Sequence, residues 1–390
     1  MKKVLKIVSL LALAVGLTLF IVACGGNGDN GGTPAANGGG TQPATTPTPN
    51  NQAEGLSIFL ISHSPPPAST LDDGSFNEGA ATGIRRFLAS NPGTYQFMQP
   101  HAATDEARLD IFADAIAAGA DVLVLPGFHF ASSVYQAQTL FPNTYFIVLD
   151  TGPTGAPASN LVGVLYAEQE SGFLAGYASV MEGFRELGFI GGVAVPAVIR
   201  FGLGFLQGAE HAAASLGLPA GSVNINYMYA GGFGAAPEHT VTASAWYVGG
   251  TEVIFVAAGA VGFSVMHAAE EAPGRWVIGV DVDQSGDSDT VLTSATKALD
   301  NSVYALLGEI RDGTFRGGNV ITFDAASDGV ALPMATSRFQ NFTEAQYTAI
   351  FNQLASGAIR VEGLVTYPLD PPAELQHVIN QLNIVNVNEI

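Results

Sequence analysis

From Leu56 onward, short apolar runs alternate along this chain with segments of helical periodicity, and few folds contain such an alternation. The runs lack polar alternation, which is typical of strands buried on both faces of a sheet. Their alternation with helices predicts parallel sheets covered by helices on both sides. Strands are expected at 56–61, 121–125, 145–150, 189–193, 253–257 and 276–280, and helices at 78–89, 131–140, 172–182, 202–216, 261–272 and 293–312.

The 390 residues and the number of expected strands favour two lobes over one large open sheet. In α/β sheets of this kind, ligands bind beyond the carboxyl ends of the strands. Several polar or glycine-containing turns follow the apolar runs, and we expect them to meet at one cleft. These turns are Pro126-Gly127, Asp150-Thr151, Gly259-Ala260 and the turn at Asp281.

The N-terminus has the pattern of a secretory leader. Three lysines precede the apolar run 7–22, and Ala23-Cys24 follows it. A cysteine directly after the cleavage point resembles a bacterial lipobox, so we expect a signal peptide at 1–23 and lipidation of Cys24. The glycine- and asparagine-rich stretch 24–54 is expected to be a disordered linker that tethers the body to the extracytoplasmic face of the cell membrane. The alternative is a transmembrane anchor with a chance cysteine.

Composition excludes several classes of function. The formal net charge is −20, so the body repels nucleic-acid phosphates, and no nucleic-acid partner is expected. Cys24 is the one cysteine, which excludes a disulfide framework and a cysteine-based zinc site. The 7 histidines have no metal-ligand spacing, and no serine lies in a nucleophile-elbow context. We therefore expect no metal, no cofactor and no catalysis.

An ordered set of segments resembles the basic membrane protein (BMP) family, whose best-known type is the purine nucleoside receptor lipoprotein. The resemblance covers the chain from about Leu56 to about Ile359. The segments that carry it are Asp-Asp-Gly-Ser-Phe-Asn at 72–77, Leu-Pro-Gly-Phe at 125–128, Phe-Ile-Val-Leu-Asp at 146–150, Ala-Glu-Gln-Glu-Ser-Gly-Phe-Leu-Ala-Gly-Tyr at 167–177, Ile-Gly-Gly-Val at 190–193, Ile-Gly-Val-Asp-Val-Asp-Gln at 278–284, and Val-Leu-Thr-Ser at 291–294 with Lys297.

The resemblance implies a type I periplasmic-binding-protein fold. Two doubly wound parallel-sheet lobes would be joined by a three-strand hinge and close over ligand. The expected two-lobed domain spans 55–390. Lobe 1 is expected at about 55–160 plus 285–320, and lobe 2 at about 161–284 plus 321–390.

The same resemblance implies the first ligand contacts. Phe76 would stack on a base, Asn77 would hydrogen-bond it, and Asp150 would accept from an amino group or a ring N–H. A flat apolar ring beside an amide suits a heterocycle. The structural alternatives are a core position for Phe76, a helix cap for Asn77 and a loop-supporting ion pair for Asp150.

Asp281 and Lys297 are implied to contact ribose hydroxyls. A carboxylate accepts hydrogen bonds from vicinal hydroxyls and an ammonium donates to them. Lys297 is expected early in a helix, where the helix dipole does not favour a cation. The alternative for this pair is a structural salt bridge between lobes.

The turn at 258–263 is expected to follow a strand and open a helix. The small residues Gly259 and Gly262 would let the backbone approach a ligand, and Phe263 is a candidate second stacking wall. The alternative for Phe263 is core packing.

One turn departs from the family pattern. The family carries an acidic residue shortly after the first strand, where it helps to read the base. Here that turn is Ser62-His63-Ser64 followed by three prolines, so a hydroxyl or an imidazole stands in the place of the acid. Base selectivity therefore stays open.

These features together predict the substrate-binding lipoprotein of an ABC importer. Its ligand would be a nucleoside, with a purine expected as the base, and its partners would be permease and ATPase subunits. A first alternative is a sensor of the same fold for another heterocycle or sugar-like solute. A second is an anchored enzyme such as a nucleoside hydrolase.

Overall fold

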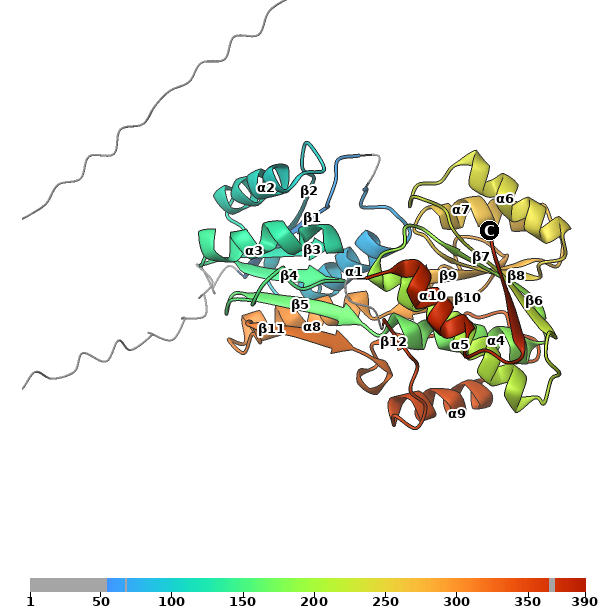
Figure 1. The fold of residues 1–390 in the computed structure, drawn as a ribbon. Coiled ribbons are helices and arrows are strands. Elements are labelled where there is room, and N and C mark those ends of the chain that lie inside the picture. The colour runs from blue at the N-terminus through green and yellow to red at the C-terminus, as the bar shows by residue number, and fades with distance from the viewer. Residues whose placement is uncertain (1–54, 67–68, 365–368) are drawn as a thin grey trace, which may run out of the picture. The chain divides into compact units, whose positions relative to one another are not determined.

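The computed structural model describes residues 55–66, 69–364 and 369–390 (Figure 1). Cys24, the expected leader and the expected linker lie outside these residues. Within the described part of the chain, no helix combines the length and the apolar character needed to cross a membrane.

The first lobe is built on a wholly parallel sheet in the order β11-β5-β4-β3-β1-β2. Successive strand residues point to opposite faces, so Ile58 and Phe59 enter different cores. Helices α1 (Phe76–Leu88) and α8 (Leu299–Arg311) cover one face, and α2 (Asp105–Ala117) and α3 (Ala131–Leu140) cover the other. The strands are β1 (Leu56–Ile61), β2 (Gly93–Met98), β3 (Val122–Pro126), β4 (Tyr145–Leu149), β5 (Leu161–Tyr166) and β11 (Asn319–Phe323).

The second lobe has the sheet order β12-β10-β9-β8-β6-β7-β13, parallel except for β12. One core lies under α4, α5, α9 and α10, and another under α6 and α7. The strands are β6 (Glu186–Gly191), β7 (Val223–Tyr229), β8 (Val253–Ala257), β9 (Trp276–Asp281), β10 (Val291–Lys297), β12 (Val330–Ala331) and β13 (Val385–Glu389). The helices are α4 (Glu168–Glu182), α5 (Pro196–Ser215), α6 (Pro237–Val248), α7 (Val261–Glu270), α9 (Glu344–Ala355) and α10 (Pro371–Ile379).

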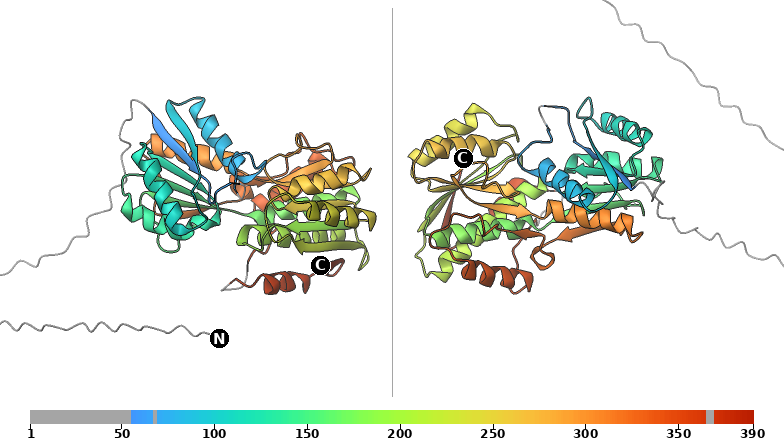
Figure 2. Two further views of the ribbon diagram at one scale, coloured as in Figure 1. Left: turned by 90° about the horizontal axis from the view of Figure 1, so that it is seen from above. Right: turned by 180° about the vertical axis from the view of Figure 1, so that it is seen from behind.

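The chain crosses between the two sheets after β5, after β10 and between β11 and β12 (Figure 2). The crossings lie against one another, because Ala167 donates its N–H to the carbonyl of Phe323 (2.9 Å) and Ala298 donates to that of Gly329 (2.9 Å). Three adjacent crossings between two parallel-sheet lobes confirm the predicted fold class. They also bring the carboxyl ends of the strands of both sheets to a common boundary.

Several expected boundaries need correction. β5 pairs in the first sheet, so lobe 1 continues to residue 166 rather than 160, and β11 extends its second part to residue 323. β10 pairs in the second sheet, so the second part of lobe 1 begins after residue 297 rather than at 285. Residues 291–297 form a strand where a helix from 293 was expected. The runs of β5 and β10 are almost wholly buried, and the periodicity of a buried run does not distinguish helix from strand or one sheet from the other.

Candidate ligand-binding site

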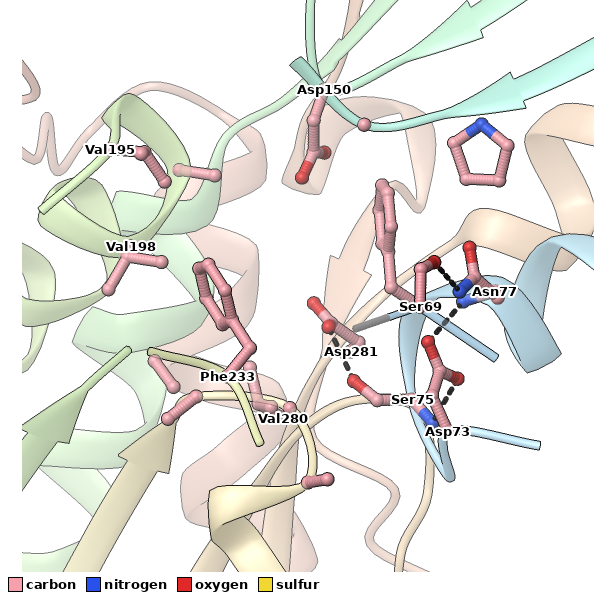
Figure 3. Close-up of a pocket in the computed structure, with 18 of the residues that line it drawn as sticks. Ser69, Asp73, Ser75, Asn77, Asp150, Val195, Val198, Phe233, Val280 and Asp281 are labelled. Carbon is pink, nitrogen blue, oxygen red and sulfur yellow. Dashed lines mark hydrogen bonds between the residues drawn. The ribbon is translucent and has the colours of Figure 1, made fainter. Parts of the chain in front are cut away.

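A cavity of about 210 Å³ lies between the two lobes (Figure 3). Its lining comes from segments that follow β1, β3 and β4 in the first lobe and β6, β7, β8 and β9 in the second, together with the end of β10. The predicted meeting of Pro126-Gly127, Asp150, Gly259 and Asp281 is observed, since all of these residues line the cavity. Carboxyl ends of parallel strands are where α/β folds place their ligands.

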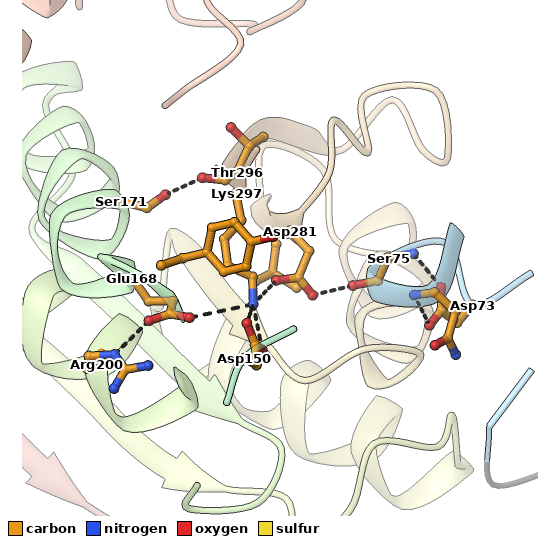
Figure 4. A network of polar contacts seen from close by, with 12 residues as sticks. Asp73, Ser75, Asp150, Glu168, Ser171, Arg200, Asp281, Thr296 and Lys297 are labelled. Atoms are coloured by element: carbon orange, nitrogen blue, oxygen red, sulfur yellow. Dashed lines mark hydrogen bonds and ion pairs between the residues drawn. The ribbon is translucent and has the colours of Figure 1, made fainter. Parts of the chain in front are cut away.

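Lys297 is the centre of a buried charged cluster at the crossings between the lobes (Figure 4). Its Nζ lies 2.8 Å from an Asp150 oxygen, 3.2 Å from Oδ1 of Asp281 and 3.7 Å from Oε1 of Glu168. Asp150 comes from the first lobe and the other three residues from the second lobe or its crossings. The ammonium therefore joins carboxylates from both halves of the protein.

The cluster keeps Lys297 protonated. Burial alone would lower the pKa of Lys297, but the carboxylates of Asp150, Asp281 and Glu168 outweigh it and raise that pKa above the ordinary value. Burial raises the pKa of Asp150 to about 7, although the neighbouring ammonium opposes this rise. Arg200 supplies a second cation, with its Nε 2.6 Å from Oε2 of the fully buried Glu168.

The loop before α1 connects the cluster to the first lobe. Ser75 donates its hydroxyl to Oδ2 of Asp281 at 2.6 Å, and Gln284 of the second lobe donates to the carbonyl of Gly74 at 3.0 Å. The carboxylate of Asp73 accepts from the backbone N–H groups of Ser75, Asn77 and Glu78 and so caps the start of α1. Burial raises the pKa of Asp73 to about 6, although these backbone N–H groups oppose the rise.

Asn77 lines the cavity but does not cap the helix, because Asp73 takes that role. Its side-chain nitrogen donates to Oγ of Ser69 (3.1 Å) and to the carbonyl of Thr70 (2.7 Å), which fixes the loop above the cavity. The carbonyl oxygen of the same amide is thus the atom that Asn77 can offer to a ligand.

Phe76 of the first lobe and Phe233 of the second are two of the four phenylalanines of the described chain that line the cavity, the others being Phe128 and Phe201. The Lys297 ammonium lies 4.5 Å from the centroid of the Phe76 ring, close enough for a cation–π contact. A flat group that packs on the Phe76 ring would therefore lie beside the charged cluster.

The expectation for Phe263 needs correction, because the residue lies outside the cavity lining and Phe233 takes its place. Phe263 is the third residue of α7 and is 39% exposed, with its ring so close to Gly74 that a Cβ there would lie 2.6 Å from Cζ. Gly262 is also absent from the lining, since α7 has already begun there, whereas Gly259 in the preceding turn does line the cavity.

Sequence reasoning missed Glu168, Arg200, Ser75 and Phe233 as members of this region. Glu168 is the first residue of α4, shortly after a strand. An acidic residue in a first helical turn is commonly explained by its favourable interaction with the helix dipole, so the sequence gives no further signal of a role in the site. Lys297 was expected inside a helix, but it is the last residue of β10. The unfavourable dipole inferred for it therefore does not exist, and the three carboxylates account for its burial instead.

The fold and its cavity define a two-lobed solute-binding protein. Solved structures support the fold: a solute-binding protein of an ABC transporter system from Conexibacter woesei DSM 14684 matches with a TM-score of 0.64 and 21% identity, over 79% of this chain and 99% of that one. A solute-binding protein of an ABC transporter system from Aeropyrum pernix K1 has a TM-score of 0.63 at 21% identity, over 84% and 85% of the two chains.

The chain belongs to the Bmp family, described as ABC transporter substrate-binding protein PnrA-like, whose model matches residues 67–363. This family comprises solute-binding proteins rather than enzymes, and the resemblance drawn from the sequence is confirmed. The ABC transporter nucleoside-binding protein BmpA of Lactococcus lactis subsp. cremoris is 28% identical over 77% of this chain and 87% of its own length. Basic membrane protein D of Borreliella burgdorferi is 27% identical over 90% and 93%.

Proposed function

We propose that this substrate-binding protein takes up a ribonucleoside between its lobes and presents it to an ABC importer. The observation that carries the proposal is the buried contact of Lys297 with Asp281 and Asp150 at one end of a cavity with aromatic walls. An ammonium 3.2 Å from a carboxylate offers a donor and an acceptor side by side, which is what a vicinal diol requires. The nucleoside-binding relative from Lactococcus lactis supports the same choice of ligand.

Each cavity residue then has a role. Phe76 and Phe233 enclose the base, Lys297 and Asp281 hold the ribose hydroxyls, and Asp150 holds Lys297 in place. Asn77 offers its amide oxygen to the base edge, and the turn at Gly259 brings backbone close to the ligand. A purine is the expected base, since aromatic side chains of both lobes line the cavity and gain most contact from the larger ring system.

Ligand would favour the joined arrangement of the lobes, because it contacts residues of both. The hydrogen bond from Ser75 to Asp281 and that from Gln284 to Gly74 already hold the two halves together in the described arrangement. Permease and ATPase subunits would recognise the joined lobes. A lipid on Cys24, with signal peptide 1–23 removed and 24–54 as tether, would keep the receptor on the extracytoplasmic face of the membrane.

Titration calorimetry with inosine, its 2′-deoxy form and its 2′,3′-dideoxy form tests the proposal. We expect binding of the ribonucleoside, at least tenfold weaker binding of the deoxynucleoside, and a further loss with the dideoxynucleoside, because each lost hydroxyl leaves a buried polar partner unsatisfied. Equal affinity for the three, or a response to free sugars with none to nucleosides, would contradict it. Mass spectrometry of the cell-purified protein after methanol extraction identifies any retained solute independently.

A further inference from the structure

Two histidines that line the cavity, His63 and His129, stack against each other. The sequence places His63 in the turn where the family carries an acidic residue, and no role was predicted for His129. His63 follows β1 and His129 follows β3, and these strands are neighbours in the first sheet. Their ring centroids lie 4.2 Å apart with an interplanar angle of 4°, and both side chains line the cavity. The Phe128 ring packs against the His129 ring, with their centroids 3.9 Å apart, and this contact helps to fix the position of His129.

Both imidazoles are neutral at physiological pH. Burial lowers the pKa of His63 to about 4, with further contributions from His129 and from the Arg108 guanidinium. Burial and Arg108 lower the pKa of His129 to about 4 as well. Arg108 is itself fixed beside the pair, since its Nε donates to the carbonyl of His63 at 3.0 Å and its Nη1 pairs with Asp105. A neutral imidazole has one donor and one acceptor nitrogen, and its tautomer can exchange the two.

The Nδ1 atoms of the pair border one empty space. Nδ1 of His129 is buried and has no hydrogen-bond partner within the described part of the chain. A Cβ at Gly127, which also lines the cavity, would lie 3.9 Å from Nδ1 of His63 and 3.9 Å from Nδ1 of His129, with no other described heavy atom within 4 Å apart from its chain neighbours. A ligand edge that enters this space would lie next to both nitrogens, and a buried nitrogen without a partner is one that a hydrogen bond from a ligand would satisfy.

We propose that His63 and His129 together read the polar edge of the base, and that they accept 6-oxo and 6-amino purines alike. This inference rests on the proposed nucleoside function. A 6-oxopurine offers an N–H donor beside a carbonyl acceptor, and a 6-aminopurine offers an acceptor nitrogen beside an amino donor. A pair of neutral imidazoles matches either order by changing tautomers, whereas a carboxylate in this place can only accept. The specificity is therefore for a donor–acceptor edge rather than for one base.

Calorimetric titration of the unmodified protein with inosine, adenosine and purine riboside is the first test, because purine riboside has no substituent at C6. We expect dissociation constants for inosine and adenosine within tenfold of each other, and at least tenfold weaker binding of purine riboside. His63→Phe and His129→Phe keep a flat ring in the stack but remove its nitrogens. Each variant is expected to weaken inosine and adenosine at least tenfold and purine riboside less than threefold, while His267→Asn on the exposed face of α7 changes none of them.

The outcomes distinguish a failure of the histidine proposal from a failure of the proposed nucleoside-binding function. If the unmodified protein binds no nucleoside, the proposed function fails and the inference fails with it. If it binds nucleosides but prefers inosine or adenosine by a hundredfold, or binds purine riboside equally well, the function stands and the inference is overturned. The same holds if both folded phenylalanine variants retain the parent affinities. The three-ligand comparison needs no substitution, so it decides the question even if a variant fails to fold.

Discussion

Asp150 and Asp281 occupy corresponding places in the two lobes and converge on the same ammonium. Asp150 directly follows β4 of the first sheet, Asp281 ends β9 of the second, and both have left-handed backbone conformations, with φ of 62° and 68°. Few residues other than glycine adopt this region, and aspartate and asparagine tolerate it best. The two strained turns aim carboxylates of different lobes at Nζ of Lys297, at 2.8 Å and 3.2 Å.

The effect of the Asp281 backbone on stability should be separable from the effect of its carboxylate on binding. Asp281→Gly and Asp281→Ala both remove the carboxylate and should both abolish tight ribonucleoside binding. The alanine variant has to adopt positive φ, so we expect it to be about 1 kcal/mol less stable than the glycine variant. Urea unfolding of the two proteins measures the difference. An alanine variant as stable as the glycine variant would show that the turn stores no strain.

Removal of the ammonium should destabilise the protein as well as abolish binding. Lys297→Met leaves the carboxylates of Asp150 and Asp281 without their cation, whereas Glu168 keeps Arg200, and breaking a buried ion pair on one side costs about 3–5 kcal/mol. Lys297 opposes the rise that burial causes in the pKa of Asp150, so the variant raises that pKa further, and its loss of stability should shrink as the pH falls from 8 to 5. Chemical unfolding at both pH values checks this. Arg311→Met removes an exposed cation and should leave the stability nearly unchanged.

The stacked histidines should make stability depend on pH between about 6.5 and 4. Their pKa values are lowered on folding to about 4, so the unfolded chain binds protons more readily in this range. Their contribution is present above pH 6.5, falls as the pH drops toward 4 and levels off below it. A double variant, His63→Phe with His129→Phe, should show a shallower loss of stability over this window. Equal slopes for both proteins in urea unfolding would exclude the pair as a source of acid sensitivity.

The aromatic walls predict unequal effects of two phenylalanines. Phe233→Ala removes a ring that lines the cavity and should weaken nucleoside binding about 10- to 100-fold. Phe263→Ala removes a ring outside the lining and should change affinity less than fivefold. Calorimetric titration of the two variants compares them directly. The reverse order would restore Phe263 as the second wall of the site.

The space around two helical glycines, Gly204 in α5 and Gly308 in α8, predicts opposite effects of the same substitution to alanine. At Gly204 a Cβ would lie 2.0 Å from the carbonyl oxygen of Gln169 in α4, so Gly204→Ala should destabilise the second lobe by about 1–3 kcal/mol. At Gly308 in α8 a Cβ would meet nothing within 4 Å, so Gly308→Ala should stabilise the protein by about 0.5–1 kcal/mol. Thermal melts give both signs, and a destabilised Gly308→Ala would contradict the open-space argument.

Local sequence patterns predicted some residues of the site and not others. Asp150 and Asp281 were expected at the cleft because each follows an apolar run, and parallel strands end at the same edge of a sheet. Phe263 was expected there on the same reasoning and is not, since its direction depends on where α7 begins. A shift of two residues in where a helix begins changes the direction of a side chain about the helix axis by roughly 200°. Element boundaries are the least reliable part of any prediction from sequence.

The sequence by itself predicted the alternation of buried strands with helices, the family membership and most of the turns that face the cavity, because these features depend on neighbours along the chain. The side of the hinge on which β5 and β10 lie, the exchange of Phe233 for Phe263, the participation of Glu168 and Arg200, and the stacking of His63 on His129 depended on the assembled lobes. These features join residues from separate segments, and the energy of a buried charge or ring depends on what surrounds it in space.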